Sequence, residues 1–242
     1  MLVRGPIPEA QAQALAEELA RLDYYEFAGR AWDGERAAGI DFFARARRNR
    51  LVGFLSPEPP SSRARLLWWA YAHPLRPILY ADEVRFFEVM ERHREQVTVP
   101  PFKRPPAPPP VPGAHRDSWR HPITDLLVPS PTRASQKIDL SQARRDLMRV
   151  AIGLSLNRQT HGSCPPSLEA LRRAGWTVPK DVFTDADFVY RPKGDDYLLH
   201  SVGFDLKDDG GRQIAWLVDP EERPRTSTPR TYSDDGDIVW GK

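Results

Sequence analysis

Apolar residues recur at a helical spacing along the N-terminal part of the chain. In the segment 8–32 they occupy positions 15, 19, 22 and 25 to 27. In the segment 34–48, Ile40, Phe43 and Ala44 fall on one side of a helix and the arginines fall on the other. Each segment is therefore predicted to be one helix.

The segment 80–97 repeats this pattern. Val84, Phe87 and Met90 share one face, and Asp82 is the predicted N-cap, because its short polar side chain can accept a hydrogen bond from a free first-turn amide. Several aromatic residues are predicted to pack in the core: Trp68, Trp69, Tyr71, Phe86 and Phe87. Residues 1–99 are therefore predicted to form a helical domain.

Residues 100–113 mark the strongest change in composition. Eight of the 13 residues from 100 to 112 are proline, in a chain with 25 prolines altogether. Because proline lacks an amide hydrogen and fixes φ, such a run disfavours helices and central strands. It is typical of an extended spacer, with recognition by a proline-binding module as the alternative. The run is predicted to link the domain 1–99 to a second domain, 114–242.

The segment 138–162 has the most regular helical pattern in the chain. Asp139 and Gln142 have the spacing of a capping box at its start, and Gly162 suits the left-handed position that ends a helix. Its apolar stripe consists of Leu140, Ala143, Leu147, Val150 and Leu154. A short second helix is predicted at 165–175.

The apolar period then changes to that of short strands. Four segments rich in aromatic and β-branched residues are separated by turn-forming residues: 187–192, 197–203, 213–218 and 237–240. This order predicts an α+β fold, in which a helical N-terminal domain is followed by a long helix packed on a small antiparallel β-sheet.

Charge and cysteine content exclude several classes of protein. The formal charge of +2 provides no strong field for nucleic acid or an anionic membrane, and the basic run 44–50 is predicted to be a solvated helix end. Cys164 is the only cysteine, so no intramolecular disulfide can form. The most apolar run, 66–80, is interrupted by prolines and charge and is too short to span a bilayer. We therefore predict no nucleic-acid partner and no membrane segment in this chain.

Four segments of the second half follow one another in a recognisable order: THGSCPPSLEAL, VPKDVFTDADFVYR, DDYLLHSVGFDLKDDGG and DDGDIVW. Together they make residues 139–240 resemble the periplasmic part of type II secretion major pseudopilins and related type IV pilin-like proteins. The resemblance implies a pilin-like fold and protein partners among assembly or secretion components. It also implies an exported, periplasmic protein whose membrane anchor is absent from this chain.

The resemblance further implies a calcium site in the acidic loop after the segment 197–203. Matching positions place Asp205 and Asp237 at this site, with Asp208 and Asp209 in the loop between them. Ca²⁺ takes about six to eight oxygen ligands, which carboxylates and the carbonyls of a glycine-rich turn can supply.

Two other interpretations of this loop are an EF-hand and an ordinary solvated turn. An EF-hand is excluded, because Lys207 would occupy its third position and Trp216 its twelfth, where a bidentate glutamate is required. An ordinary solvated turn stays open, because Asp, Lys and Gly are common turn residues.

No catalytic signature occurs in the sequence. The six histidines show no zinc-binding spacing, and there is no nucleophile elbow, phosphate-binding loop or dinucleotide fingerprint. Cys164 is predicted to be a turn residue rather than a reactive thiol. His200 lies in the middle of a strand, where a histidine more often packs than catalyses. The chain is therefore predicted not to be an enzyme.

The sequence thus predicts a non-enzymatic pilin- or pseudopilin-like structural or assembly protein, stabilised by calcium in its acidic loop. An alternative is a protein- or glycan-binding module that uses the aromatic-rich N-terminal half, around Trp68 and Trp69. A hydrolase is a third hypothesis, and it would require a pocket that collects His, Asp or Glu from both halves.

Overall fold

The computed structural model describes residues 8–48, 62, 66, 76–104, 121–128, 131–194, 196–214 and 236–240. The chain divides into two compact units. The sheet unit consists of Met1–Tyr24, Pro100–Lys103 and Lys137–Lys242, and the helical unit consists of Tyr25–Val99 and Arg104–Gln136. The described residues up to Tyr24 thus belong with the sheet unit, whereas their helical pattern placed them with the other helices of the N-terminal half.

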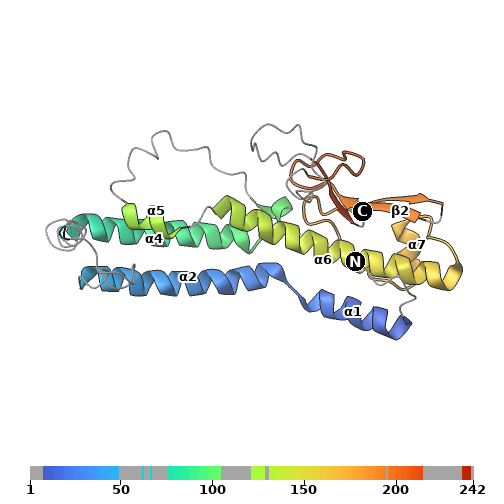
Figure 1. Cartoon of the computed structure of the whole chain (residues 1–242), viewed down its shortest axis with the longest axis horizontal. Helices are drawn as coiled ribbons and strands as arrows, with labels where there is room; N and C mark the ends of the chain where they lie inside the picture. The colour runs from blue at the N-terminus through green and yellow to red at the C-terminus, as the bar shows by residue number, and fades with distance from the viewer. Residues whose placement is uncertain are drawn as a thin grey trace. The chain divides into compact units, whose positions relative to one another are not determined.

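The core of the sheet unit forms along one long helix. Its helices are α1 (Glu9–Arg21), the greater part of α6 (Pro131–His161) and α7 (Leu168–Arg173). The predicted stripe of the long helix is confirmed, because all five of its residues are buried. They form one hydrophobic cluster with Leu171, Phe188 and Leu199 from the rest of the unit. In the view of Figure 1, the sheet lies on one side of this part of α6 and α1 lies on the other.

The sheet has three antiparallel strands in the order β1-β2-β3. Their bounds are β1 (Val189–Lys193), β2 (Asp196–Ser201) and β3 (Ile238–Trp240). Leu199 at the centre pairs with Tyr190 on one side and Trp240 on the other. The α+β class is therefore confirmed. Of the predicted strand 213–218, Gln213 forms an isolated bridge to Asp237 and Ile214 is buried, while 215–218 lie outside the described residues.

The predicted ends of α6 and of the short helix after it, α7, are both confirmed. Gly162 has φ 75°, and its amide donates to the carbonyl of Arg158 at 2.8 Å. Ser167 caps α7, where its side chain accepts a hydrogen bond from the amide of Ala170 at 3.2 Å. Gly175 follows α7 with φ 87°.

The predicted start of the long helix is wrong, because α6 begins at Pro131. Asp139 and Gln142 therefore lie inside the helix, and both are buried. Instead of capping its own helix, the Gln142 side chain accepts a hydrogen bond from the amide of Tyr24 at 3.1 Å, 118 residues away. Tyr24 is the first residue of α2 (Tyr24–Arg47). The segment 8–32 is thus two helices rather than one, and the chain breaks where Leu22 takes an extended conformation.

The helical unit contains most of α2, together with α4 (Arg76–Val97) and α5 (Pro122–Leu127). The helices α2 and α4 are joined by a hydrogen bond from Trp32 Nε1 to the carbonyl of Met90 at 3.0 Å. Gly39 permits a close approach, because a Cβ atom there would lie 2.2 Å from the ring of Phe86.

The buried faces of these helices differ from those predicted. Phe43 and Met90 are buried as expected, but Ile40 is 50% exposed and Val84 is 58% exposed. The buried residues of α4 are Leu79, Asp82, Phe86, Met90 and Val97. Since Phe86 and Phe87 are neighbours of equal apolar character, their spacing alone did not show which of them faces the partner helix.

Asp82 is a helix cap, but not of the helix that was predicted. It lies inside α4, fully buried, and its carboxylate accepts hydrogen bonds from the amides of Ile123 at 2.8 Å and Thr124 at 3.0 Å. The Thr124 hydroxyl donates to the same carboxylate at 2.6 Å. These groups belong to the first turn of α5, so Asp82 supplies the acceptors that this short helix lacks.

Part of the predicted linker has local structure. Pro101–Lys103 form one turn of 3-10 helix, which corrects the expectation that the whole run is extended; residues 105–113 lie outside the described part of the chain. Trp68, Trp69 and Tyr71 also lie outside it.

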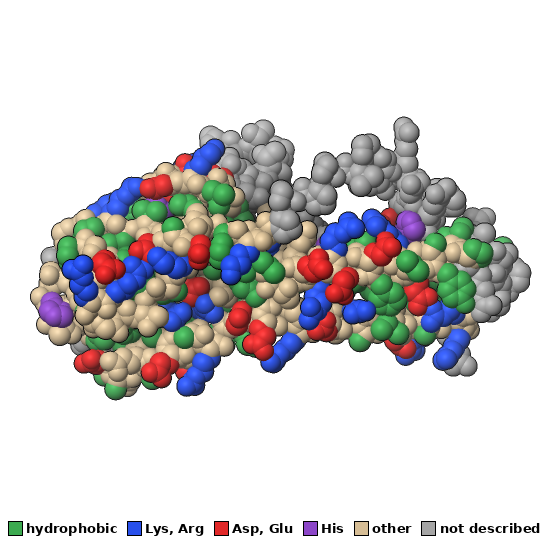
Figure 2. Space-filling view, turned by 180° about the vertical axis from the view of Figure 1, so that it is seen from behind, with side chains coloured by type: hydrophobic (Ala, Val, Ile, Leu, Met, Phe, Trp, Pro, Cys, Tyr) green, Lys and Arg blue, Asp and Glu red, His purple; other side chains and the backbone are tan. Residues whose placement is uncertain are grey.

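Among the described helices, none combines the length and apolar content that a bilayer crossing requires. On the face shown in Figure 2, acidic and basic side chains of the described residues are interspersed.

A pH dependence is expected from His93 in α4. Burial, together with the nearby positive charges of Arg92 and Arg85, lowers its pKa from 6.5 to about 4. Its ring packs edge-on against Trp32, with the ring centroids 6.0 Å apart. Between about pH 4 and about pH 6.5 the imidazole of His93 is protonated in the unfolded chain but neutral in the folded chain. The neutral ring therefore contributes its full stabilisation above about pH 6.5, and this contribution is lost as the pH falls toward about 4.

We expect the free energy of unfolding of the helical unit to fall by about 1–2 kcal/mol between about pH 7 and about pH 4, as measured by urea unfolding, because solvent screens part of the effect at a half-buried ring. His93→Gln removes this titrating group and should flatten the profile. His161→Gln, an exposed histidine at the end of α6, is the control and should leave the profile unchanged. Equal pH profiles for wild type and His93→Gln would contradict the assignment.

Candidate functional site

The candidate site lies where β2 enters the acidic loop and the chain returns into β3. Ser201 at the end of β2 pairs with Ile238, so Asp237 reaches the site from the other strand. The loop turns through left-handed backbone conformations, with φ 70° at Gly203 and 86° at Gly211. A Cβ atom at Gly203 would lie 2.7 Å from the carbonyl oxygen of Gly236, so only glycine fits where the two chain segments meet.

Asp237 holds the loop closed. Its side chain is 0% exposed, and its carboxylate accepts hydrogen bonds from the amides of Gly211 at 2.7 Å and Asp209 at 3.3 Å. Its own amide donates to the carbonyl of Arg212 at 2.7 Å. One buried side chain therefore satisfies two loop amides that face it, a requirement that burial makes strict.

His200 joins the two carboxylates of the site. Its side chain is 0% exposed, and Nε2 lies 3.0 Å from Asp208 Oδ1 and 3.6 Å from Asp237 Oδ2. Asp208 also accepts a hydrogen bond from the amide of Gly210 at 2.9 Å and pairs with Arg191. The hydrogen bond from His200, followed by that from Gly210, holds the pKa of Asp208 below its usual value.

A second buried carboxylate supports the end of β2 from another direction. Asp181 accepts hydrogen bonds from the amides of Phe183 at 3.0 Å and Val202 at 3.3 Å. Burial raises the pKa of Asp181, against the lowering effect of these hydrogen bonds. Asp181 thus fixes the end of β2, while Asp237 fixes the loop that follows it.

The structure brings together two of the four predicted metal ligands. Asp208 and Asp237 form one group with His200, whose three ligand atoms all lie within 4.8 Å of one another. Asp205 instead accepts a hydrogen bond from the amide of Lys207 at 3.2 Å, and Asp209 pairs with Arg212 at 2.8 Å.

His200 was not predicted from the sequence to be a functional residue. The signal for it was present, because an ionisable residue lies in an otherwise apolar strand directly before the acidic loop. Its pairing with Val239 brings it beside Asp237.

The donor set does not match calcium well. One imidazole nitrogen and two carboxylates suit Zn²⁺ or a similar cation better than Ca²⁺, which takes oxygen ligands. A metal-bound imidazole usually donates its second N–H to an acceptor, whereas Nδ1 of His200 is buried and has no hydrogen-bond partner in the described part of the chain. The arrangement therefore fits a hydrogen-bonded clasp, in which Nε2–H, assigned from the carboxylates around it, donates to Asp208.

Comparison of the chain with protein-family models, with curated proteins and with solved structures gave no match. The function is therefore argued from the residues and the geometry.

Proposed function

We propose that the sheet unit is a non-enzymatic, pilin-like structural module through which copies of this protein assemble. The proposal rests on the contacts that the ionisable side chains at the end of the sheet make with the backbone and with one another. Asp237 and Asp208 accept backbone hydrogen bonds, and His200 is fully buried between them. Such groups fix the shape of a loop, and they do not leave a nucleophile or base facing a substrate.

The long helix packed on a small sheet supports the same proposal. A single amphipathic helix that covers an antiparallel sheet is also the arrangement implied by the resemblance to type II secretion pseudopilins. All four resembling segments contribute to these elements: they include the end of α6 with α7, the first residues of β1, the strand β2 with its loop, and β3. The partners in this proposal are further copies of the chain or other assembly components outside the cytoplasm.

Sedimentation velocity over about a hundred-fold range of concentration tests the proposal, because mass action makes association depend on concentration. A photo-crosslinking residue at Arg158 in α6 or Lys193 in β1, both exposed, should give crosslinks between copies. The same probe at Glu88, an exposed position of α4, is the control and should give none. A monomer at every concentration, with no crosslink from either position in the sheet unit, would reject self-assembly.

Calcium stabilisation is a separate hypothesis for the same loop. A melting temperature that is higher in Ca²⁺ than in EDTA, with the difference lost in Asp237→Asn, would support it. Equal melting temperatures would leave the hydrogen bonds of Asp237 as the means by which the loop is closed.

A further inference from the structure

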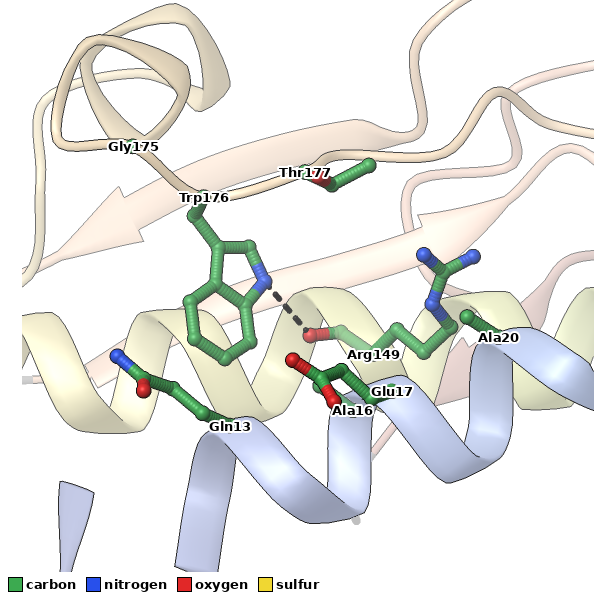
Figure 3. A pocket seen from close by; sticks show the side chains of 8 residues that line it. All are labelled: Gln13, Ala16, Glu17, Ala20, Arg149, Gly175, Trp176 and Thr177. Atoms are coloured by element: carbon green, nitrogen blue, oxygen red, sulfur yellow. Dashed lines mark hydrogen bonds between the residues drawn. The ribbon is translucent and has the colours of Figure 1, made fainter. Parts of the chain in front are cut away.

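A cavity of about 330 Å³ lies within the sheet unit, away from the acidic loop. Eight residues line it: Gln13, Ala16, Glu17, Ala20, Arg149, Gly175, Trp176 and Thr177. One wall is α1, and the other consists of α6 and the turn that follows α7, as Figure 3 shows. The volume is at the lower end of the range of about 300–1,000 Å³ found for small-molecule sites, so a small ligand fits it.

Arg149 presents an unsatisfied edge of its guanidinium to this cavity. Its Nη1 lies 3.3 Å from Asp146 Oδ1, but its Nε is buried and has no hydrogen-bond partner among the described residues. Its Nη2 likewise makes no hydrogen bond with a described residue. Nε and Nη2 share one edge of the guanidinium, and together they match the two oxygens of a carboxylate.

An ion pair with Asp146 fixes the position of this guanidinium. Asp146 is buried and is shared by Arg149 and Arg145, whose Nη2 lies 2.6 Å from it. One carboxylate between two arginines leaves an excess positive charge at the wall of the cavity. A buried charged N–H without an acceptor is costly, so the site favours a ligand that brings an anionic oxygen.

Trp176 provides the apolar surface of the cavity. Its Nε1 donates to the carbonyl of Arg149 at 3.1 Å. Its ring lies against α6 at Gly153, where a Cβ atom would come within 2.4 Å of Nε1. The indole is therefore held in one orientation, and Ala16 and Ala20 face the cavity from the opposite wall with only methyl groups (Figure 3).

Glu17 supplies a negative charge on the α1 wall. Its carboxylate has no ion pair or hydrogen bond with any described residue, whereas Glu18 on the same helix pairs with Arg21. The cavity therefore carries an unpaired guanidinium edge on one wall, a carboxylate on the other and an apolar surface between them.

We propose that this cavity binds a free apolar α-amino acid. The carboxylate of the ligand occupies the Nε/Nη2 edge of Arg149, its ammonium group faces Glu17, and its side chain lies against Trp176 and the two alanines. A bound amino acid joins α1 to α6 and to the turn after α7, so occupancy stabilises the docking of α1 within the sheet unit.

Titration of the ¹⁵N-labelled full chain with L-leucine and with L-phenylalanine tests the proposal. The indole Nε1–H signal of Trp176, identified from its loss in Trp176→Phe, should shift in a saturable manner with at least one of the two. The matching amines without the carboxylate and the matching acids without the amine should each bind about tenfold more weakly or worse. Absence of saturable binding by both amino acids, or equal binding of the amines, would overturn the proposal.

Substitutions in the cavity distinguish the loss of a ligand contact from the loss of the fold. Arg149→Lys keeps the charge and removes the two-donor edge, and it should weaken binding about tenfold or more, with Arg144→Lys on the exposed side of α6 as its control. Glu17→Gln should weaken amino-acid binding but not binding of the amine-free acid, with Glu18→Gln as its control. Ala20→Trp fills the cavity from an exposed position and should abolish binding while the melting temperature is retained. Unchanged binding in all three variants would place the ligand elsewhere.

Discussion

Asp237→Ala is expected to lower the free energy of unfolding of the sheet unit by about 3–5 kcal/mol, the largest effect of any single change in the acidic loop. The substitution leaves the buried amide of Gly211 and the partly buried amide of Asp209 without their acceptor. It also removes a charge that lies 3.6 Å from the buried ring of His200. Urea unfolding followed by the near-UV signal of the sheet unit measures the loss.

Two variants show which property of Asp237 matters. Asp237→Asn keeps the shape of the side chain and one good acceptor, so it should lose less stability than Asp237→Ala. Asp205→Ala is the matched control in the same loop, because its side chain accepts a hydrogen bond from the amide of Lys207 at the surface. It should cost less than about 1 kcal/mol. Equal losses for Asp205→Ala and Asp237→Ala, or an unchanged exchange rate of the Gly211 amide, would contradict the clasp.

Asp82→Ala is expected to cost the helical unit about 3–4 kcal/mol and to release α5. The carboxylate accepts three hydrogen bonds from the first turn of that helix, and it is fully buried. A helix of six residues has little stability of its own, because the cost of its first turn is not repaid over so short a length. Hydrogen exchange of the amides of Ile123 and Thr124 should therefore become fast.

Asp125→Ala is the control for this change. Asp125 is an exposed aspartate of the same helix, and its loss should leave the exchange of both amides slow. Asp82→Asn should fall between the two, since it keeps an acceptor but loses the charge. If α5 stays protected in Asp82→Ala, the helix is held by its packing rather than by this cap.

The elements of the sheet unit could be predicted because their signals are local. The stripe of the long helix, the glycine that ends it and three of the four strands each depend on residues close together in the chain. The caps could not be predicted in the same way. Asp82, Gln142 and Asp237 accept hydrogen bonds from amides that are 41, 118 and 26 residues away, respectively. A local pattern shows that such a residue can cap, and only the fold shows which helix or loop it caps.

The candidate site was predicted in part for the same reason. Asp208 and Asp237 do meet, but Asp205 and Asp209 were expected to join them at one ion, and the backbone turns these two side chains toward other partners. Leu206 takes φ 60° and Gly210 φ 70°, and these left-handed turns accompany the separate partners of Asp205 and Asp209. His200 was missed because the sequence shows an ionisable residue before the acidic loop but not that β3 brings Asp237 beside it.

The pairing of Asp237 with Arg212 and Ile214 has a consequence for engineering the chain. The Asp237 amide donates to the carbonyl of Arg212 at 2.7 Å, and the Ile214 amide donates to the carbonyl of Asp237 at 3.2 Å. Both ends of the segment 215–235 are thus joined at the base by backbone hydrogen bonds that do not involve the segment itself. This position can therefore carry an inserted reporter or affinity peptide while the sheet keeps its register.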